Sequence, residues 1–220
     1  MQVELVDKMG TDLSVVNAAR VSYAGHKDVM DAKDEKLISF LAKHNHWSPF
    51  SHASLQFRIS APIFVARQLV KHQVGLSWNE VSRRYVSYKP DLYAIKEWRG
   101  KPKDSKQGSA GTVELSEDDE LMYASTMIAC EELYQRLLDL GIAPEQARAV
   151  LPQSMMTEWY WSGSLYAFAR VCNLRCAKDT QLETQMIANQ IDTICAKAVS
   201  YTHLRAHETS LHLVCRLLLE

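Results

Sequence analysis

Alternating and helical hydrophobic patterns divide the chain into strands near its start and helices farther along. The segment 54–60 alternates strictly and places Leu55, Phe57 and Ile59 on one face, which predicts a half-buried strand. The opening VELVDKMG alternates in the same way and predicts a second strand. Apolar residues that recur three and four positions apart predict helices over 12–20, 34–43 and 63–72.

Helical periodicity dominates the second half. A long helix is expected over 116–141, because Ser116 precedes an acidic first turn and Gly141 follows the last apolar position. A short helix should run from Pro144 to Pro152. Two further helices are expected, over 154–176 and 180–198. Strands early and helices late indicate the α+β class rather than an alternating parallel fold.

Two polar stretches interrupt these elements. Residues 74–88 read as a loop with extended portions. Residues 99–112 contain no apolar side chain larger than alanine, which predicts a solvated, mobile loop.

Charge and composition exclude several classes of protein. Lys and Arg number 25 and Asp and Glu 26, so the net charge of −1 argues against a polybasic nucleic-acid binder. The start lacks the apolar core of a signal peptide, and no run approaches the ~20 apolar residues of a membrane span. The five cysteines form no CxxC pair, which favours reduced core thiols. We therefore expect a cytoplasmic protein that binds neither nucleic acid nor membrane.

A dense polar cluster lies between residues 67 and 85. It combines cations, hydrogen-bonding groups and flat rings: Arg67, Lys71, His72, Trp78, Asn79, Glu80, Ser82, Arg83, Arg84 and Tyr85. Cations at the end of a helix can simply offset its dipole. The additional donors, acceptors and rings favour a pocket for a ligand with a phosphate and a heterocycle, such as a nucleotide or a flavin.

Other candidates allow more than one interpretation. His44, His46 and His52 surround Trp47 and suit a metal site, a hydrogen-bonding loop, or a ligand contact by His52 alone. Farther along, the arginines at 148, 170 and 175 either form structural ion pairs with the acids at 158, 179 and 183 or bind an anionic ligand.

In their order along the chain, these segments resemble the flavin-dependent thymidylate synthases, the ThyX family. The matching stretches are Pro49-Phe50-Ser51-His52, Arg67-Gln68, Lys71-His72-Gln73, Asn79-Glu80-Val81-Ser82-Arg83-Arg84-Tyr85, Ala147-Arg148-Ala149-Val150-Leu151-Pro152, Leu174-Arg175 and Thr180-Gln181-Leu182-Glu183. Lys71 and Gln73 replace two arginines of the family signature, and the distance from Gln73 to Ser82 is one residue longer than usual. The family's Asn-x-Arg-Ser stretch is not evident at 162–165.

The resemblance implies a fold and an assembly. The fold would be ThyX-like α+β, with an antiparallel sheet and long helices, assembled as a homotetramer whose active sites combine several subunits. A single domain would occupy residues 1–198. The tail, 199–220, resembles translated adapter sequence and is expected to be non-native, with an amphipathic last helix as the alternative.

The resemblance also implies an activity. It is the reductive methylation of dUMP to dTMP, with methylenetetrahydrofolate as the carbon donor and FAD, reduced by NADPH, as the hydride source. The alternative is a non-catalytic or altered-specificity relative that binds flavin and nucleotide. A cysteine-dependent thymidylate synthase is rejected, because Ser154 follows Leu-Pro-Gln and no cysteine lies in a Pro-Cys-His setting.

Roles for individual residues follow from the same resemblance. The residues expected to bind dUMP are Gln68, Lys71, Glu80, Ser82, Arg84, Arg148 and Arg175. Those expected to contact FAD are His52, Lys71, His72, Gln73 and Glu80. Arg175, Ser82 and His72 are the catalytic candidates, with Arg175 polarising the uracil ring and Ser82 positioning rather than attacking. No metal is expected.

Overall fold

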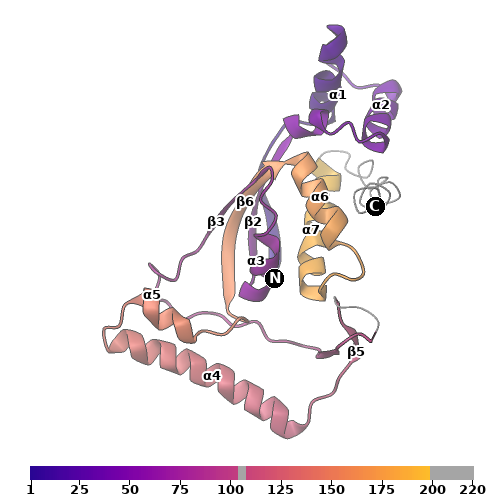
Figure 1. Ribbon diagram of the computed structural model, residues 1–220. Coiled ribbons are helices and arrows are strands. Elements are labelled where there is room, and N and C mark those ends of the chain that lie inside the picture. Colours follow the sequence, from indigo (N-terminus) through magenta and orange to yellow (C-terminus); the bar gives the residue numbers. More distant parts are fainter. Residues whose placement is uncertain (104–107, 199–220) are drawn as a thin grey trace, which may run out of the picture.

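The computed structural model describes residues 1–103 and 108–198, which are built around an antiparallel sheet (Figure 1). Four strands form it in the order β1 (Gln2–Met9), β2 (Ser54–Pro62), β6 (Met156–Ser164) and β3 (Leu76–Glu80). Each neighbouring pair is antiparallel. This confirms the two predicted strands, and β3 is the extended part of the polar stretch 74–88.

The segment 154–176 is not one helix, so that prediction is wrong. Its first part is the central strand β6, and helix α6 (Leu165–Arg175) begins only where the Ser164 hydroxyl accepts the Ala167 amide at 3.2 Å. Trp159 and Trp161 alternate with polar residues and are buried on the face that the helices cover. A short run of large aromatic side chains suits a buried strand as well as a buried helix, and the pattern alone does not separate the two.

Three helices cover one face of the sheet: α3 (Ile63–Leu69), α6 and α7 (Leu182–Ala198) (Figure 1). Helix α3 ends three residues earlier than the predicted helix, so that Lys71 and His72 follow the helix instead of lying on it. In the core, Phe168 of α6 meets Phe57 and Trp161 edge to face, with ring centroids 4.9 and 5.4 Å apart. This packing fixes α6 against the sheet.

An N-terminal pair of helices projects from one end of the sheet (Figure 1). Helices α1 (Asp12–Arg20) and α2 (Ala32–Lys43) confirm the predictions for this region. The short 3-10 turns η1 (Val21–Tyr23) and η2 (Ser48–His52) connect them to each other and to β2.

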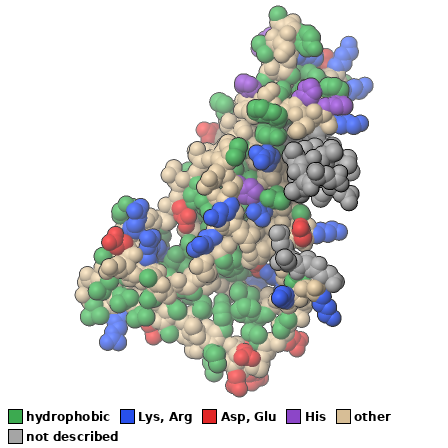
Figure 2. All heavy atoms as spheres, viewed as in Figure 1, with side chains coloured by type: hydrophobic (Ala, Val, Ile, Leu, Met, Phe, Trp, Pro, Cys, Tyr) green, Lys and Arg blue, Asp and Glu red, His purple; other side chains and the backbone are tan. Residues whose placement is uncertain are grey.

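The long helix α4 (Glu117–Asp139) lies apart from the sheet and leads into α5 (Pro144–Ala147) and η3 (Arg148–Val150) (Figure 1). Its apolar positions are largely uncovered: Leu121 is 70% and Ile128 is 55% exposed. The predicted helix is thus confirmed, but few of its apolar side chains are covered by the described part of the chain. Figure 2 shows hydrophobic side chains gathered on the surface in this region of the molecule.

The segment 99–112 is more ordered than expected. Strands β4 (Arg99–Gly100) and β5 (Ala110–Thr112) pair antiparallel, which corrects the prediction of an unstructured loop at these positions. Residues 104–107 and the predicted tail, 199–220, lie outside the described residues. In the part of the chain that the structure describes, no helix is long and apolar enough to cross a membrane.

Candidate active site

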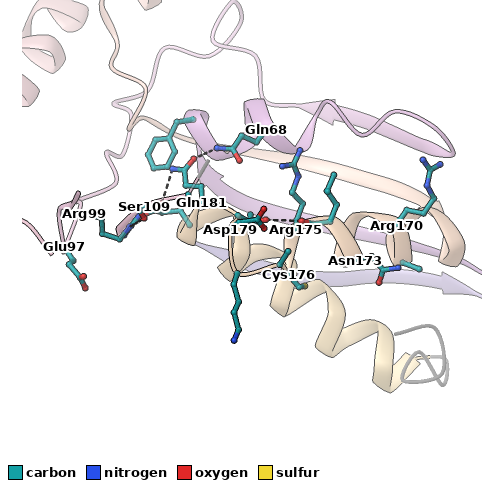
Figure 3. A pocket seen from close by; sticks show the side chains of 18 of the residues that line it. Gln68, Glu97, Arg99, Ser109, Arg170, Asn173, Arg175, Cys176, Asp179 and Gln181 are labelled. Carbon is teal, nitrogen blue, oxygen red and sulfur yellow. Dashed lines mark hydrogen bonds and ion pairs between the residues drawn. The ribbon is translucent and has the colours of Figure 1, made fainter. Parts of the chain in front are cut away.

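A cavity of about 1580 Å³ lies between α3, α6, the start of α7 and the segment around β4 and β5 (Figure 3). It exceeds the roughly 300–1,000 Å³ typical of small-molecule pockets. Its wall combines aromatic rings with amides, cations and acids. The lining includes Phe64, Gln68, Trp98, Arg99, Tyr166, Arg170, Arg175, Gln181 and Glu183.

A buried ion pair joins two walls of this cavity. The Arg99 Nη2 donates to both carboxylate oxygens of Glu183, at 2.6 and 2.7 Å. Burial raises the pKa of the Glu183 carboxyl, but hydrogen bonds from Arg99 and Gln181 outweigh it and leave this pKa below its usual range. The pair therefore ties the first residue of β4 to the start of α7.

The Gln68 amide is held by the same structure. Its oxygen accepts the Thr184 hydroxyl at 3.1 Å, and its nitrogen donates to the Gln181 oxygen. Gln181 in turn donates to Glu183 at 3.1 Å. These contacts give the amide one defined orientation and connect it, through Glu183, to Arg99.

His72 and Arg175 meet beside the cavity although 103 residues separate them. The Arg175 Nε donates to His72 Nε2 at 2.9 Å. Burial, together with the positive charges of Arg175 and Arg170, lowers the pKa of His72 to about 4. Burial also lowers the pKa of Arg175. Two catalytic candidates from the sequence are thus brought together.

The structural ion pairs considered for these arginines are absent. Among the described residues, no carboxylate lies within 4.0 Å of the guanidinium of Arg170 or Arg175. Two of the three proposed partners are engaged elsewhere, Glu183 with Arg99 and Glu158 with Arg58 at 2.9 Å. The cavity therefore keeps two cations available for an anionic or carbonyl-bearing ligand.

Other predicted residues form a separate group at the end of β3. Glu80 accepts from the Trp78 indole at 3.1 Å and from the Thr157 hydroxyl at 2.9 Å. The Ser82 hydroxyl accepts the Arg84 Nε at 3.1 Å. The cavity is not lined by Glu80, Ser82 or Arg84, so within a single chain these residues lie apart from Arg175.

The remaining predicted residues lie apart as well. Arg148 is exposed in η3, where its Nε donates to the Glu145 carbonyl at 3.2 Å. His52, Lys71 and Gln73 are exposed and line no part of the cavity. Among the predicted residues that the structure describes, Gln68 and Arg175 line the cavity and His72 contacts Arg175, while the others lie apart from it.

The histidine-rich segment shows no metal-binding geometry. The ring of His44 packs against Phe40 in a tilted arrangement, with ring centroids 4.3 Å apart, and the centroid of the His46 ring lies 5.9 Å from that of Phe40. The described residues contain no cluster of three or more His, Cys, Asp or Glu side chains that could hold a metal ion.

Sequence reasoning missed two contributors to the site. Arg99 belongs to a segment interpreted as solvated, and Tyr166 to a helix treated only as core. The position of Arg99 directly after Trp98 was the available signal, because an aromatic residue at the edge of a polar stretch marks where the chain returns to the protein.

The wall fits a flavin in its chemistry. Phe64, Trp98 and Tyr166 supply flat faces of the kind that pack against a ring system, and Arg170 and Arg175 supply charge without a protein counter-ion. The cavity is also large enough for a dinucleotide together with a second ligand.

Comparison with known proteins supports this interpretation. The family model of the thymidylate synthase complementing protein, Thy1, matches residues 4–199. A flavin-dependent thymidylate synthase of Kosmotoga olearia is 40% identical over 84% of this chain and 81% of its own length. A flavin-dependent thymidylate synthase of Thermus thermophilus is 39% identical over 90% of this chain and 72% of its own.

A solved structure agrees with the fold. The UMP/dUMP methylase PolB from Streptomyces cacaoi, bound with 5-Br dUMP, superimposes with a TM-score of 0.80 at 35% identity, over 92% of each chain. With the family model and the relatives covering most of the sequence, the chain belongs to the thymidylate synthase complementing protein family, the flavin-dependent thymidylate synthases.

Proposed function

We propose that the chain is a flavin-dependent thymidylate synthase that methylates dUMP at C5 to give dTMP. The observation that carries this proposal is the pairing of an oriented amide, Gln68, with a cation that has no carboxylate partner, Arg175, in one large cavity. The reaction and the substrate class are supported by the relatives, which are flavin-dependent thymidylate synthases, and by the 5-Br dUMP bound to PolB.

Arg175 and Gln68 have the groups that a uracil ring requires. A pyrimidine edge presents carbonyl oxygens and one N–H, which match a guanidinium donor and an amide with both donor and acceptor. Positive charge at a ring carbonyl stabilises the negative charge that develops when C5 attacks the carbon donor. Arg175 thus serves as the polarising residue, and Gln68 as an orienting one.

The residues that do not reach the cavity point to an assembly. Ser82, Arg84 and Arg148 have the chemistry of a phosphate site, yet they lie at β3 and η3, away from Arg175. Helix α4 also leaves Leu121 and Ile128 exposed. Both features support a homotetramer in which neighbouring subunits complete each site and cover α4.

The cofactor and co-substrates complete the proposal. When bound, FAD would supply the hydride, NADPH would renew it, and methylenetetrahydrofolate would give the carbon. His72 lies near the cations of α6. By resemblance to the family, it would contact the flavin together with Lys71, Gln73, His52 and Glu80 of this chain or of a neighbouring subunit. A cytoplasmic location remains a prediction.

Two measurements on the purified full chain test the function. A flavin absorption band that changes when dUMP is added, and dTMP formed from dUMP, methylenetetrahydrofolate and NADPH, would support it. Colourless protein that takes up no added FAD would overturn it. Binding of FAD and dUMP without dTMP formation would favour the non-catalytic alternative, and UMP in place of dUMP would show whether the pocket requires the deoxyribose.

A further inference from the structure

The contact between His72 and Arg175 has a fixed chemical direction. A guanidinium has only N–H donors and does not lose its proton in proteins. The Arg175 Nε at 2.9 Å from His72 Nε2 is therefore the donor, and the Nε2 lone pair accepts. The proton of the ring must then lie on Nδ1, because a protonated Nε2 would oppose one N–H to another.

We infer that His72 is a positioning residue for the methylation: by accepting the Nε–H it fixes the Arg175 guanidinium, leaving its terminal nitrogens for the pyrimidine ring. This inference rests on the proposed function. It gives His72 a role through Arg175 and removes it from direct proton transfer at Nε2.

The surroundings of His72 favour the accepting form. The histidine is half-buried, and the nearby charges that act on it are the cations Arg175 and Arg170. Among the described residues no carboxylate forms an ion pair with it. Burial and these cations hold its pKa near 4, so that the ring is neutral at neutral pH and keeps its lone pair available.

Position also matters for Arg175 itself. It lies in the last turn of α6, and its long side chain has no ion-pair partner to restrain it within the described chain. An unrestrained arginine loses considerable rotamer freedom when it binds a ligand. The hydrogen bond to His72 already restricts the Arg175 side chain in the free protein, so less rotamer freedom is lost when a ligand binds.

The test compares two substitutions of His72 in the full-length holoenzyme. His72→Leu removes the acceptor, while His72→Gln offers an amide oxygen that can accept from Arg175 Nε. We expect His72→Leu to weaken kcat/KM for dUMP by roughly 10–100-fold, as for loss of a hydrogen bond to a charged group, and His72→Gln to recover most of it. Bound FAD per chain is measured for both variants, and kcat/KM is compared per FAD-loaded chain, so that a loss of flavin is separated from the effect on dUMP.

A double-mutant cycle with Arg175→Lys checks that His72 acts through Arg175. Lysine keeps the charge but has no Nε–H, so His72→Leu should cost little more once Arg175 is lysine. His26→Leu, in an exposed loop, is the matched control for losing a histidine and should behave as wild type. Thermal unfolding of each variant identifies any that fails to fold.

Three results would overturn the inference while leaving the function intact: a His72→Leu enzyme as active as wild type, a His72→Gln enzyme no better than His72→Leu, or an undiminished His72→Leu effect beside Arg175→Lys. Wild-type protein that neither binds dUMP nor forms dTMP would instead overturn the proposed function.

Discussion

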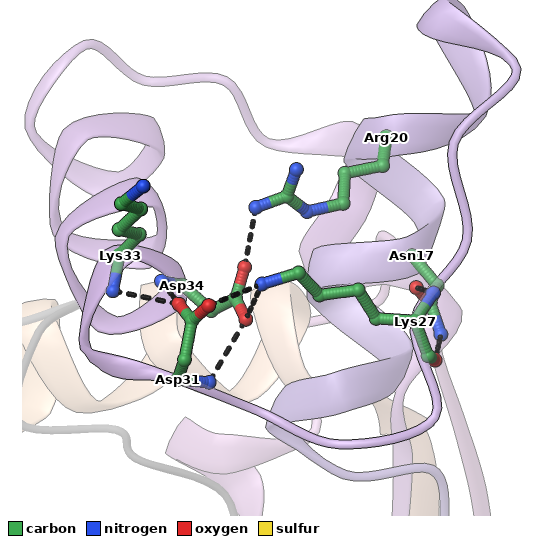
Figure 4. A network of polar contacts seen from close by, with 6 residues as sticks. All are labelled: Asn17, Arg20, Lys27, Asp31, Lys33 and Asp34. Atoms are coloured by element: carbon green, nitrogen blue, oxygen red, sulfur yellow. Dashed lines mark hydrogen bonds and ion pairs between the residues drawn. The ribbon is translucent and has the colours of Figure 1, made fainter.

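Two clusters of charge use opposite arrangements. At the corner between α1 and α2, Lys27 Nζ donates to Asp31 at 2.7 Å and to Asp34 at 2.8 Å, and Arg20 also reaches Asp34 (Figure 4). Asp31 in addition caps α2 through the Lys33 and Asp34 amides. The four side-chain charges of this network, on Arg20, Lys27, Asp31 and Asp34, thus each have a partner of opposite sign.

The cavity leaves charge unpaired. Arg170 and Arg175 have no carboxylate within 4.0 Å among the described residues, although Arg99 on the opposite wall is paired with Glu183. Neither arginine gains ion-pair stabilisation from the described part of the chain, which is consistent with a role in binding an anionic or carbonyl-bearing ligand. Matched charges thus hold the corner together, while the two cations without a carboxylate partner among the described residues lie at the cavity in which we propose that the substrate binds.

The sharpest way to break this comparison is to remove Arg175. We expect Arg175→Ala to reduce turnover of dUMP by roughly 100-fold or more, as when a donor to developing negative charge is lost. Its thermal midpoint should stay near that of wild type, because no ion pair is broken. Steady-state dTMP formation and thermal unfolding measure the two effects. The buried-cysteine variant Cys172→Ala is the control and should keep turnover near that of wild type. Equally high turnover in Arg175→Ala would contradict the assignment of the site.

The reverse result is expected at the corner. Asp34→Asn leaves Lys27 and Arg20 without their shared buried carboxylate and should lower the thermal midpoint by several degrees. Turnover per folded molecule should remain close to wild type, since the corner does not line the cavity. A stable Asp34→Asn protein with poor activity would show that the corner also serves the site.

Glu183 belongs to both arrangements, because it is paired with Arg99 and also lines the cavity. Glu183→Gln weakens the ion pair with Arg99 and the support of Gln181, so the orientation of Gln68 relaxes. We expect KM for dUMP to rise several-fold, with a modest loss of thermal stability. Arg99→Ala should have a similar effect, and the double variant should be no worse than the more severe single one. If the effects of Glu183→Gln and Arg99→Ala on KM are additive, the two residues do not act through one ion pair that supports Gln68.

Local patterns predicted the elements better than the contacts between them. The alternation of apolar and polar residues predicted β2, and the capping pattern predicted α4, because both patterns depend on residues that are close in sequence. The same reasoning mistook β6 for a helix, since a central strand is decided by the helices that cover it.

The site was predictable only where an ordered motif existed. Gln68 and Arg175 were identified through the family resemblance and do line one cavity. The pairing of Arg175 with His72, 103 residues away, follows from how α3 and α6 pack on the sheet and has no local signal. Arg99 was missed for the same reason, because its partner Glu183 is 84 residues away.

The smallest expected effect concerns acid stability. The folded ring of His72 resists protonation, since its pKa lies near 4 instead of the usual 6.5, while the unfolded chain takes up the proton normally. Between these two values the unfolded state binds more protons, so His72 reduces stability progressively as the pH falls from about 6.5 toward 4.

His72→Gln lacks this titration and isolates it. Any stability advantage of wild type over His72→Gln at pH 7 should shrink as the pH falls to 5, in thermal unfolding curves recorded at both values. Asp34 does not interfere over this range: hydrogen bonds from Lys27 and Arg20 outweigh the opposing effect of burial and keep its pKa below the usual 3.8. Its stabilisation is thus present throughout and is lost only at more acidic pH. If the stability difference between wild type and His72→Gln is the same at pH 7 and pH 5, the folded protein does not keep His72 neutral. The effect of the unpaired cations on their surroundings would then not extend to His72.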